Sequence, residues 1–305
     1  IPITILTLMM VRYSPSTAIK LNGGDSYQIA ALGKVEAKSD WLDEKGEFIG
    51  KNCHWSKNSE DKNIFFNKCL KTEKSKKNIY LVGDSHATML YFSFNEITKK
   101  YKNIYNEINY IHNNGIPKIL NEGVIPPEID FILKNIKEND ILMITFFRGK
   151  MYDKIKILKL KEDPFKFENV NKRYANAKLV LAKISKILES KKSKLILIDD
   201  GPILGQRKRA ESCLVALKIR SKDVCAVNKE QSLHDRKPMT EVFREVSANY
   251  ENVYYIDYHN LVCSNKCSVI RNNKLNMIDF NHISRSTSIE LSDFFYKKLI
   301  EIQND

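Results

Sequence analysis

From residue 78 onward the chain alternates short apolar runs with amphipathic segments, and this alternation constrains the fold more than any other feature. A strand that is apolar throughout must be covered on both faces, and a helix after each strand lets the next strand run parallel. Short apolar or alternating runs lie at 79–82, 104–111, 141–147, 195–198 and 253–256, and segments of helical spacing lie at 86–100, 126–137, 169–190, 238–249 and 284–302. The pattern predicts an α/β fold, a three-layer flavodoxin-like sandwich with a parallel central sheet. Ligands then bind outside the carboxyl ends of the strands.

Length and local composition suggest one large domain with an N-terminal extension. At roughly 150 residues per domain, 305 residues fit one large domain plus an accessory segment. We assign 78–305 to the main domain and the polar, irregular residues 12–77 to a linker and extension packed on it. Residues 1–11 are nearly all apolar and begin with Ile1 rather than methionine. Because they are too few to span a bilayer and follow no basic region, we expect them to be the end of a truncated transmembrane helix.

The positive charge of the chain does not by itself identify a polyanionic partner. The formal net charge is +13, and lysine is interleaved with asparagine and isoleucine along the whole sequence, as in 74–78 and 191–194. No helix-turn-helix, zinc-finger or RNA-binding signature accompanies the charge. We therefore expect no nucleic-acid partner, whereas an attraction to membrane surfaces stays compatible with the composition.

Six cysteines fall in three local groups, each in a polar, loop-like stretch. Sequence alone cannot choose among the possible pairings, but pairing of neighbours is the simplest because short loops close easily. A zinc site at Cys53, His54 and Cys69 is the rival interpretation, but its spacing matches no C-x2-C pattern. Free buried thiols are the other alternative. An even number in local pairs favours an oxidising compartment, no metal, and the disulfides Cys53–Cys69, Cys213–Cys225 and Cys263–Cys267.

The first apolar run ends in Gly83-Asp84-Ser85-His86-Ala87, which places a serine hydroxyl where a strand meets a helix N-terminus. Free backbone N–H groups and the positive end of the helix dipole can stabilise an oxyanion there. The competing interpretation is that Asp84 or Ser85 only caps the helix. The G-x-S-x-G nucleophile elbow does not fit, because residue 87 is alanine.

A second motif, Asp279-Phe280-Asn281-His282, precedes the last amphipathic segment. A D-x-x-H spacing lets the carboxylate fix the orientation and tautomer of the imidazole, which leaves the other ring nitrogen to accept a proton from a serine. The remaining histidines lack a carboxylate at this spacing. The alternative is an ordinary polar loop histidine.

Together these two motifs resemble the SGNH (GDSL-like) hydrolase superfamily, in which the first supplies a nucleophile and the late D-x-x-H supplies the acid and base. The variants Gly-Asp-Ser-His-Ala and Asp-Phe-Asn-His-Ile-Ser look like the SGNH domain fused behind a membrane-bound acyltransferase family 3 domain. The resemblance covers about residues 78–303. It implies the SGNH hydrolase fold, a catalytic main domain, and Ser85, His282 and Asp279 as the catalytic triad.

The oxyanion hole of the superfamily is matched less well. SGNH enzymes usually add a glycine and an asparagine to it, and Gly115 is the candidate for the glycine. Arg148 stands after the third strand where no asparagine occurs, and it is a candidate for stabilising negative charge or else a surface arginine. The backbone N–H of Ser85 is the donor that the resemblance carries over, while Asp84 and His86 are expected to brace the turn.

Such fusions O-acetylate bacterial surface polysaccharides, notably lipopolysaccharide O-antigen. The resemblance implies a periplasmic domain of an inner-membrane protein that passes an acetyl group through Ser85 to a sugar hydroxyl. It also implies no cofactor in this domain, acetyl-CoA as the donor used by an upstream membrane domain of the same polypeptide, and an O-antigen oligosaccharide as acceptor. An esterase or deacetylase with the same triad and a non-catalytic glycan-guiding module are the alternatives.

Overall fold

The structure is a computed structural model, and it describes residues 70, 76–112, 116–152, 158–205, 213, 225–272 and 274–305. The predicted transmembrane end at 1–11, nearly all of the extension at 12–77, Gly115, and the pair Cys53–Cys69 lie outside the described residues.

A parallel sheet of five strands, in the order β2-β1-β3-β4-β6, forms the centre of the described domain. Its strands are β1 (Ile79–Gly83), β2 (Asn109–His112), β3 (Ile141–Thr145), β4 (Lys194–Ile198) and β6 (Val253–Ile256). The first strand, β1, has β2 on one side, and β3, β4 and β6 follow on the other side. The carboxyl ends of β1 and β3 therefore lie next to each other in the interior of the sheet edge. This is the edge where a ligand site is expected.

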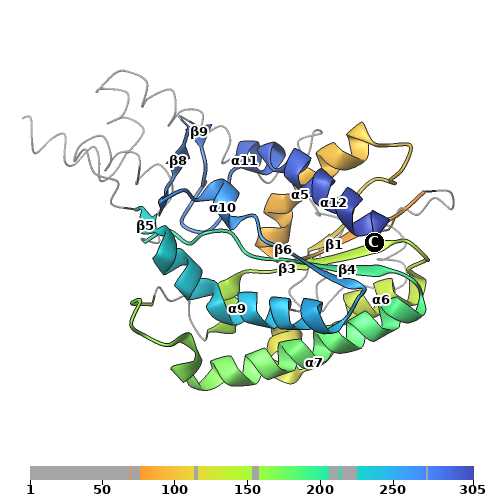
Figure 1. Cartoon of the computed structure of the whole chain (residues 1–305), viewed down its shortest axis with the longest axis horizontal. Coiled ribbons are helices and arrows are strands. Elements are labelled where there is room, and N and C mark those ends of the chain that lie inside the picture. The colour runs from red at the N-terminus through yellow and green to blue at the C-terminus, as the bar shows by residue number, and fades with distance from the viewer. Residues whose placement is uncertain are drawn as a thin grey trace, which may run out of the picture.

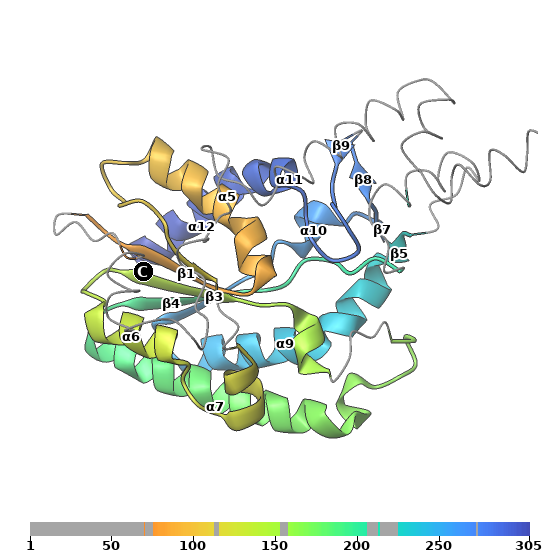
Figure 2. The same cartoon turned by 180° about the vertical axis from the view of Figure 1, so that it is seen from behind.

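Helices cover both faces of this sheet, which gives the predicted three layers (Figure 1, and from behind Figure 2). One face carries α5 (Ser85–Lys100), α11 (Arg285–Glu290) and α12 (Ser292–Asn304). The other carries α6 (Pro127–Asn135), α7 (Glu168–Ser190) and α9 (Lys229–Asn249). The predicted α/β sandwich with a parallel central sheet is confirmed.

Two hydrophobic cores, one on each side of the sheet, explain why the strands read as apolar throughout. In β1, Ile79 and Leu81 join the core beneath α5 and α12, while Tyr80 and Val82 join the core of α6, α7 and α9. All four side chains are buried. Because successive strand residues point to opposite faces, each strand must supply apolar side chains to both layers.

The structure differs from the sequence prediction at several element ends. The strand expected at 104–111 is shorter, because β2 covers only Asn109–His112. The helix expected at 238–249 begins earlier, because these residues are the second half of α9. The first turns of α9 bury Ser232, Asp235 and Arg236, so no apolar stripe marks them in the sequence. Pro238, which lies inside α9, looks like a helix start because proline is favoured in the first turn. The predicted last helix is α11 followed by α12, separated at Leu291.

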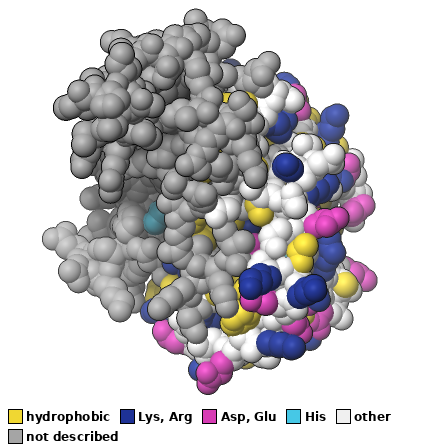
Figure 3. All heavy atoms as spheres, turned by 90° about the vertical axis from the view of Figure 1, so that its left-hand side faces the viewer, with side chains coloured by type: hydrophobic (Ala, Val, Ile, Leu, Met, Phe, Trp, Pro, Cys, Tyr) yellow, Lys and Arg dark blue, Asp and Glu magenta, His cyan; other side chains and the backbone are white. Residues whose placement is uncertain are grey.

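Short elements that the sequence did not indicate lie between these. They are the π-helix η1 (Lys118–Glu122), the 3-10 turns η2 (Arg148–Met151) and η3 (Pro164–Lys166), α10 (His259–Val262), and the paired strands β5 (Val227–Asn228) with β7 (Lys266–Cys267) and β8 (Ile270–Arg271) with β9 (Lys274–Leu275). Within the described ranges, none of the helices has both the length and the apolarity needed to cross a bilayer. On the described part of the face in Figure 3, Lys and Arg alternate with Asp and Glu rather than forming a patch of one sign.

We expect Gly83→Ala to destabilise the domain, because a Cβ at this position would lie 1.9 Å from Thr145 O and 2.7 Å from Ala87 Cβ. Neither neighbour is a flexible side-chain end, so β1, β3 or α5 must shift, at a cost of about 1–3 kcal/mol. Thermal unfolding measures the loss. Gly205→Ala is the matched control, since its Cβ would come no closer than 3.6 Å to Ala226 O. Equal melting temperatures for the two variants would contradict this account of the β1–β3 contact.

Candidate active site

The turn from β1 into α5 is held by the carboxylate of Asp84. Its Oδ1 accepts a hydrogen bond from the backbone N–H of His86 at 3.0 Å, so Asp84 is the N-cap of α5. The backbone N–H of Phe147, just past the end of β3, donates to both carboxylate oxygens at 3.1 Å. Asp84 therefore ties the ends of two neighbouring strands together and leaves Ser85 as the first residue of the helix.

Ser85, His282 and Asp279 form one hydrogen-bonded chain at this point. The Ser85 Oγ lies 2.8 Å from His282 Nε2, and His282 Nδ1 lies 2.7 Å from Asp279 Oδ2. A carboxylate only accepts hydrogen bonds, so the proton of the neutral imidazole sits on Nδ1 and Nε2 accepts from the serine hydroxyl. The structure thus brings together the three residues that the two motifs predicted. This arrangement can move a proton from the hydroxyl to the imidazole.

Asp279, the aspartate of this hydrogen-bonded triad, is stabilised in its ionised form. Burial raises the pKa of Asp279, but the hydrogen bond and charge of His282, together with two backbone N–H groups, lower it overall. The backbone N–H groups of Asn281 and His282 add to this, since each donates to Asp279 Oδ1 at 2.9 Å. An ionised Asp279 keeps the imidazole in one tautomer and stabilises the imidazolium that forms when His282 accepts a proton.

A second histidine, His86, lies beside His282. The sequence indicated no chemical step for it. His86 is buried, and its ring centroid lies 4.9 Å from that of His282. Its Nδ1 lies 2.5 Å from Asp200 Oδ1, and its Nε2 lies 2.9 Å from Asn281 Nδ2. The only sequence signals were the position of His86 after Ser85 and that of Asp200 just after an apolar run.

Arg148, the candidate after β3, is a buried residue rather than a surface arginine. Its side chain is 1% exposed, and its Nη1 donates to the backbone oxygens of Gly201 at 3.3 Å and Ser232 at 3.1 Å. Its own backbone N–H donates to Asp200 Oδ2 at 2.9 Å. These contacts hold the loop after β3 against the loop after β4 and the first turn of α9. The role of Arg148 in stabilising negative charge stays a prediction from the sequence. The other candidate, Gly115, is outside the described residues.

A row of buried charges lies along the same carboxyl edge. Arg236, on α9, pairs with Asp199 after β4 at 3.2 Å and with Asp257 after β6 at 2.7 Å. Thr240 also donates to Asp199, at 2.7 Å. The pKa of Asp257 is lowered, because Arg236 outweighs the effect of burial. The network fixes the strand ends next to the site, and its members carry no sequence motif.

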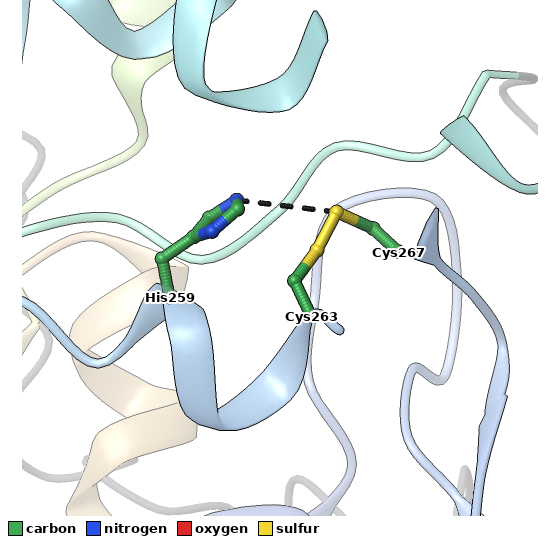
Figure 4. Close-up of side chains that lie close together, drawn as sticks. All are labelled: His259, Cys263 and Cys267. Atoms are coloured by element: carbon green, nitrogen blue, oxygen red, sulfur yellow. Dashed lines mark hydrogen bonds between the residues drawn. A yellow bond between two sulfur atoms is a disulfide. The ribbon is translucent and has the colours of Figure 1, made fainter. Parts of the chain in front are cut away.

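Two disulfides are present in the described chain, Cys213–Cys225 and Cys263–Cys267, as predicted from local pairing. Cys263 and Cys267 also lie close to His259, and the potential ligand atoms of the three residues are all within 4.8 Å of one another (Figure 4). With the two sulfurs bonded to each other, this group offers no thiolate. His259 Nε2 lies 2.9 Å from the Ser232 hydroxyl, and burial lowers the pKa of His259 to about 3. The group as it stands is therefore a disulfide packed against a neutral imidazole.

A serine at the carboxyl edge of a parallel sheet, hydrogen-bonded to a D-x-x-H histidine before the last helices, defines the SGNH class of proteins. The family model described as "SGNH domain (fused to AT3 domains)" matches residues 52–297, and the chain belongs to this family. A search of curated proteins found no match to the chain.

Among solved structures, the chain resembles the periplasmic domain of a lipopolysaccharide acetyltransferase from Salmonella ser. Paratyphi A. The TM-score is 0.55 at 16% identity, and the likeness covers 90% of this chain and 97% of that one. A looser likeness, with a TM-score of 0.41 at 11% identity, covers 78% of this chain and 93% of a Bacteroides fragilis protein provisionally named an acylhydrolase. YxiM of Bacillus subtilis follows with a TM-score of 0.37 at 15% identity, over 74% of this chain and 56% of that one. At this identity the first likeness shows a shared fold.

We expect peptide mapping without reductant to recover Cys213 joined to Cys225 and Cys263 joined to Cys267. Cys263 and Cys267 are buried, so they should resist alkylation until the protein is both unfolded and reduced. The same mapping tests Cys53–Cys69, which stays a prediction from the sequence. Recovery of six thiols that alkylate in the native protein would contradict the assignment to an oxidising compartment.

Proposed function

We propose that this domain is an O-acetyltransferase that carries an acetyl group on Ser85 and passes it to a sugar hydroxyl of a bacterial surface polysaccharide such as lipopolysaccharide O-antigen. The observation that carries the proposal is the hydrogen-bonded chain from Ser85 through His282 to Asp279 at the N-terminus of α5. Membership of a family whose domains are fused to membrane acyltransferase domains supports the acyl-transfer part. The likeness to a lipopolysaccharide acetyltransferase domain is the reason for naming this acceptor.

In the first half-reaction Ser85 takes up the acyl group. As Ser85 Oγ bonds to the carbonyl carbon, its proton moves to His282 Nε2 over the 2.8 Å hydrogen bond. The carbonyl oxygen becomes an oxyanion at the N-terminus of α5, where the backbone N–H of Ser85 belongs to the first helical turn. When the tetrahedral intermediate collapses, the bond to the donor's leaving group breaks and His282 returns the proton to that group.

In the second half-reaction a sugar hydroxyl takes the place of the leaving group. It gives its proton to His282, attacks the acyl carbon, and releases Ser85, whose Oγ receives the proton back. Asp279 stays ionised throughout and stabilises the imidazolium each time it forms. Water in place of the sugar would make the same residues an esterase, so the acceptor depends on how well the occupied site excludes water.

The donor side of the proposal concerns the rest of the polypeptide. We assign this domain to the periplasm, as part of an inner-membrane protein whose upstream acyltransferase domain uses acetyl-CoA. The family description supports such a fusion partner, and the disulfides support an oxidising compartment. On this proposal the domain needs no cofactor of its own, because Ser85, His282 and Asp279 supply the nucleophile, the base and the orienting carboxylate.

We expect Ser85→Ala and His282→Ala each to abolish hydrolysis of an activated aryl acetate while the melting temperature stays close to that of the wild type. Asp279→Asn should lose about 10²–10⁴-fold, because it favours the wrong imidazole tautomer. Ser247→Ala, the same change on the partly exposed surface of α9, is the control and should keep full activity. Unchanged hydrolysis by folded Ser85→Ala would disprove the proposed role of this serine.

We expect the isolated domain to hydrolyse activated acetates slowly but not to acetylate an O-antigen oligosaccharide from acetyl-CoA. The chain has no phosphate-cradling glycine-rich loop of the P-loop or dinucleotide type, and lysine attraction to the donor phosphates weakens with salt. Mass spectrometry of the oligosaccharide after incubation detects the gain of one acetyl group. Ser85-dependent, salt-insensitive acetylation in this mixture would show that the domain needs no membrane partner.

A further inference from the structure

His86 links three parts of the chain that are distant in sequence. It is the second residue of α5, and through Nδ1 it bonds to Asp200, at the end of β4, at 2.5 Å. Asp200 is itself fixed, because its Oδ2 accepts the backbone N–H of Arg148 at 2.9 Å. The imidazole also stacks on the ring of Phe147, with centroids 4.8 Å apart. His86 is therefore held by residues just past the ends of β3 and β4, in addition to its contact with the catalytic loop.

The contact with that loop runs through Asn281. The amide Nδ2 of Asn281 lies 2.9 Å from His86 Nε2, and the backbone N–H of Asn281 donates to Asp279 Oδ1 at 2.9 Å. Residues 279–282 reach α5 through this hydrogen bond and through the bond between His282 and Ser85. The bond to His86 persists when the serine is acylated and its hydroxyl no longer donates to His282.

We propose that His86, anchored by Asp200, is a positioning residue for the proposed reaction: it holds Asn281 and thereby keeps the 279–282 loop where Asp279 and His282 meet Ser85. The inference rests on the proposed function only in its last step, that His282 acts on Ser85. It assigns a task to a buried hydrogen-bonded pair that the triad chemistry does not use.

The two hydrogen bonds of His86 define which ring nitrogen carries the proton. The Asp200 carboxylate only accepts, so Nδ1 carries the proton, and Nε2 accepts from the Nδ2–H of Asn281. The neutral imidazole is therefore the form that holds Asn281, because a protonated Nε2 would face a second donor there.

Two substitutions test the link at its two ends. Asn281→Ala removes the amide that reaches His86, and His86→Gln removes the imidazole between Asn281 and Asp200. If His86 acts through Asn281, the double variant loses no more than the slower single variant, because both changes break the same link.

The experiment measures the rate at which a fluorophosphonate labels Ser85. We expect Asn281→Ala and His86→Gln each to slow labelling by about 10- to 100-fold, the loss typical of a misplaced catalytic group. The double variant should be no slower than the slower single variant, which independent losses of folded protein would not reproduce. His234→Gln, on α9 where the ring contacts Glu162 O, is the matched control and should leave the labelling rate unchanged.

Wild-type labelling rates in folded Asn281→Ala and His86→Gln would overturn the positioning role. If His86→Gln fails to fold, Asn281→Ala decides alone. Additive losses in the double variant would also overturn this role. If wild type and Ser85→Ala label equally, the proposed function is wrong, and the backbone amide resonances of residues 279–282 still test this inference by nuclear magnetic resonance. Changed amide shifts of these residues in His86→Gln then support the link to the loop, and unchanged shifts overturn it.

Discussion

The carboxylate of Asp84 is the interaction on which the site depends. It accepts hydrogen bonds from the first turn of α5 and from the chain just beyond β3, where no ladder partner is available to Phe147 N–H. Gly83 allows the close approach, because a side chain there would meet the carbonyl of Thr145. The nucleophile, its helix and the neighbouring strand end therefore have one fixed relation. The loops that bring Asp200 and His282 are placed against this unit.

The sequence predicted the strands of the central sheet well, but it missed the first half of α9 and the two-residue strands. Strands such as 79–82 and 195–198 are apolar on both faces, so burial in two cores marks them clearly. The first half of α9 was missed because its inner face carries Asp235 and Arg236, whose partners lie on other segments. The two-residue strands of β5–β7 and β8–β9 are too short for any periodicity. Long-range polar contacts, which leave no local pattern, form these parts.

The residues of the site divide in the same way. Ser85, Asp279 and His282 were recognisable because each belongs to a short motif in which neighbours in sequence are also neighbours in chemistry. Asp200 and His86 are 114 residues apart, and only the order of strands in the sheet brings them together. The burial of Arg148 was equally hidden in the sequence: its place after β3 was compatible with a surface position, yet the residue is buried and its Nη1 donates to two carbonyl groups.

The serine and the histidine are 197 positions apart in the chain, which has a consequence for folding. The base arrives only with the last segment, whose α12 packs on α5 through Phe295 and Phe94, with ring centroids 4.9 Å apart. Closing so long a segment is entropically costly and comes late in a folding reaction. During synthesis, the segment that carries Ser85 leaves the ribosome before the segment that carries His282. Catalytic competence therefore reports that the segment carrying Asp279 and His282 has docked on α5, and a domain without that contact carries an inert serine.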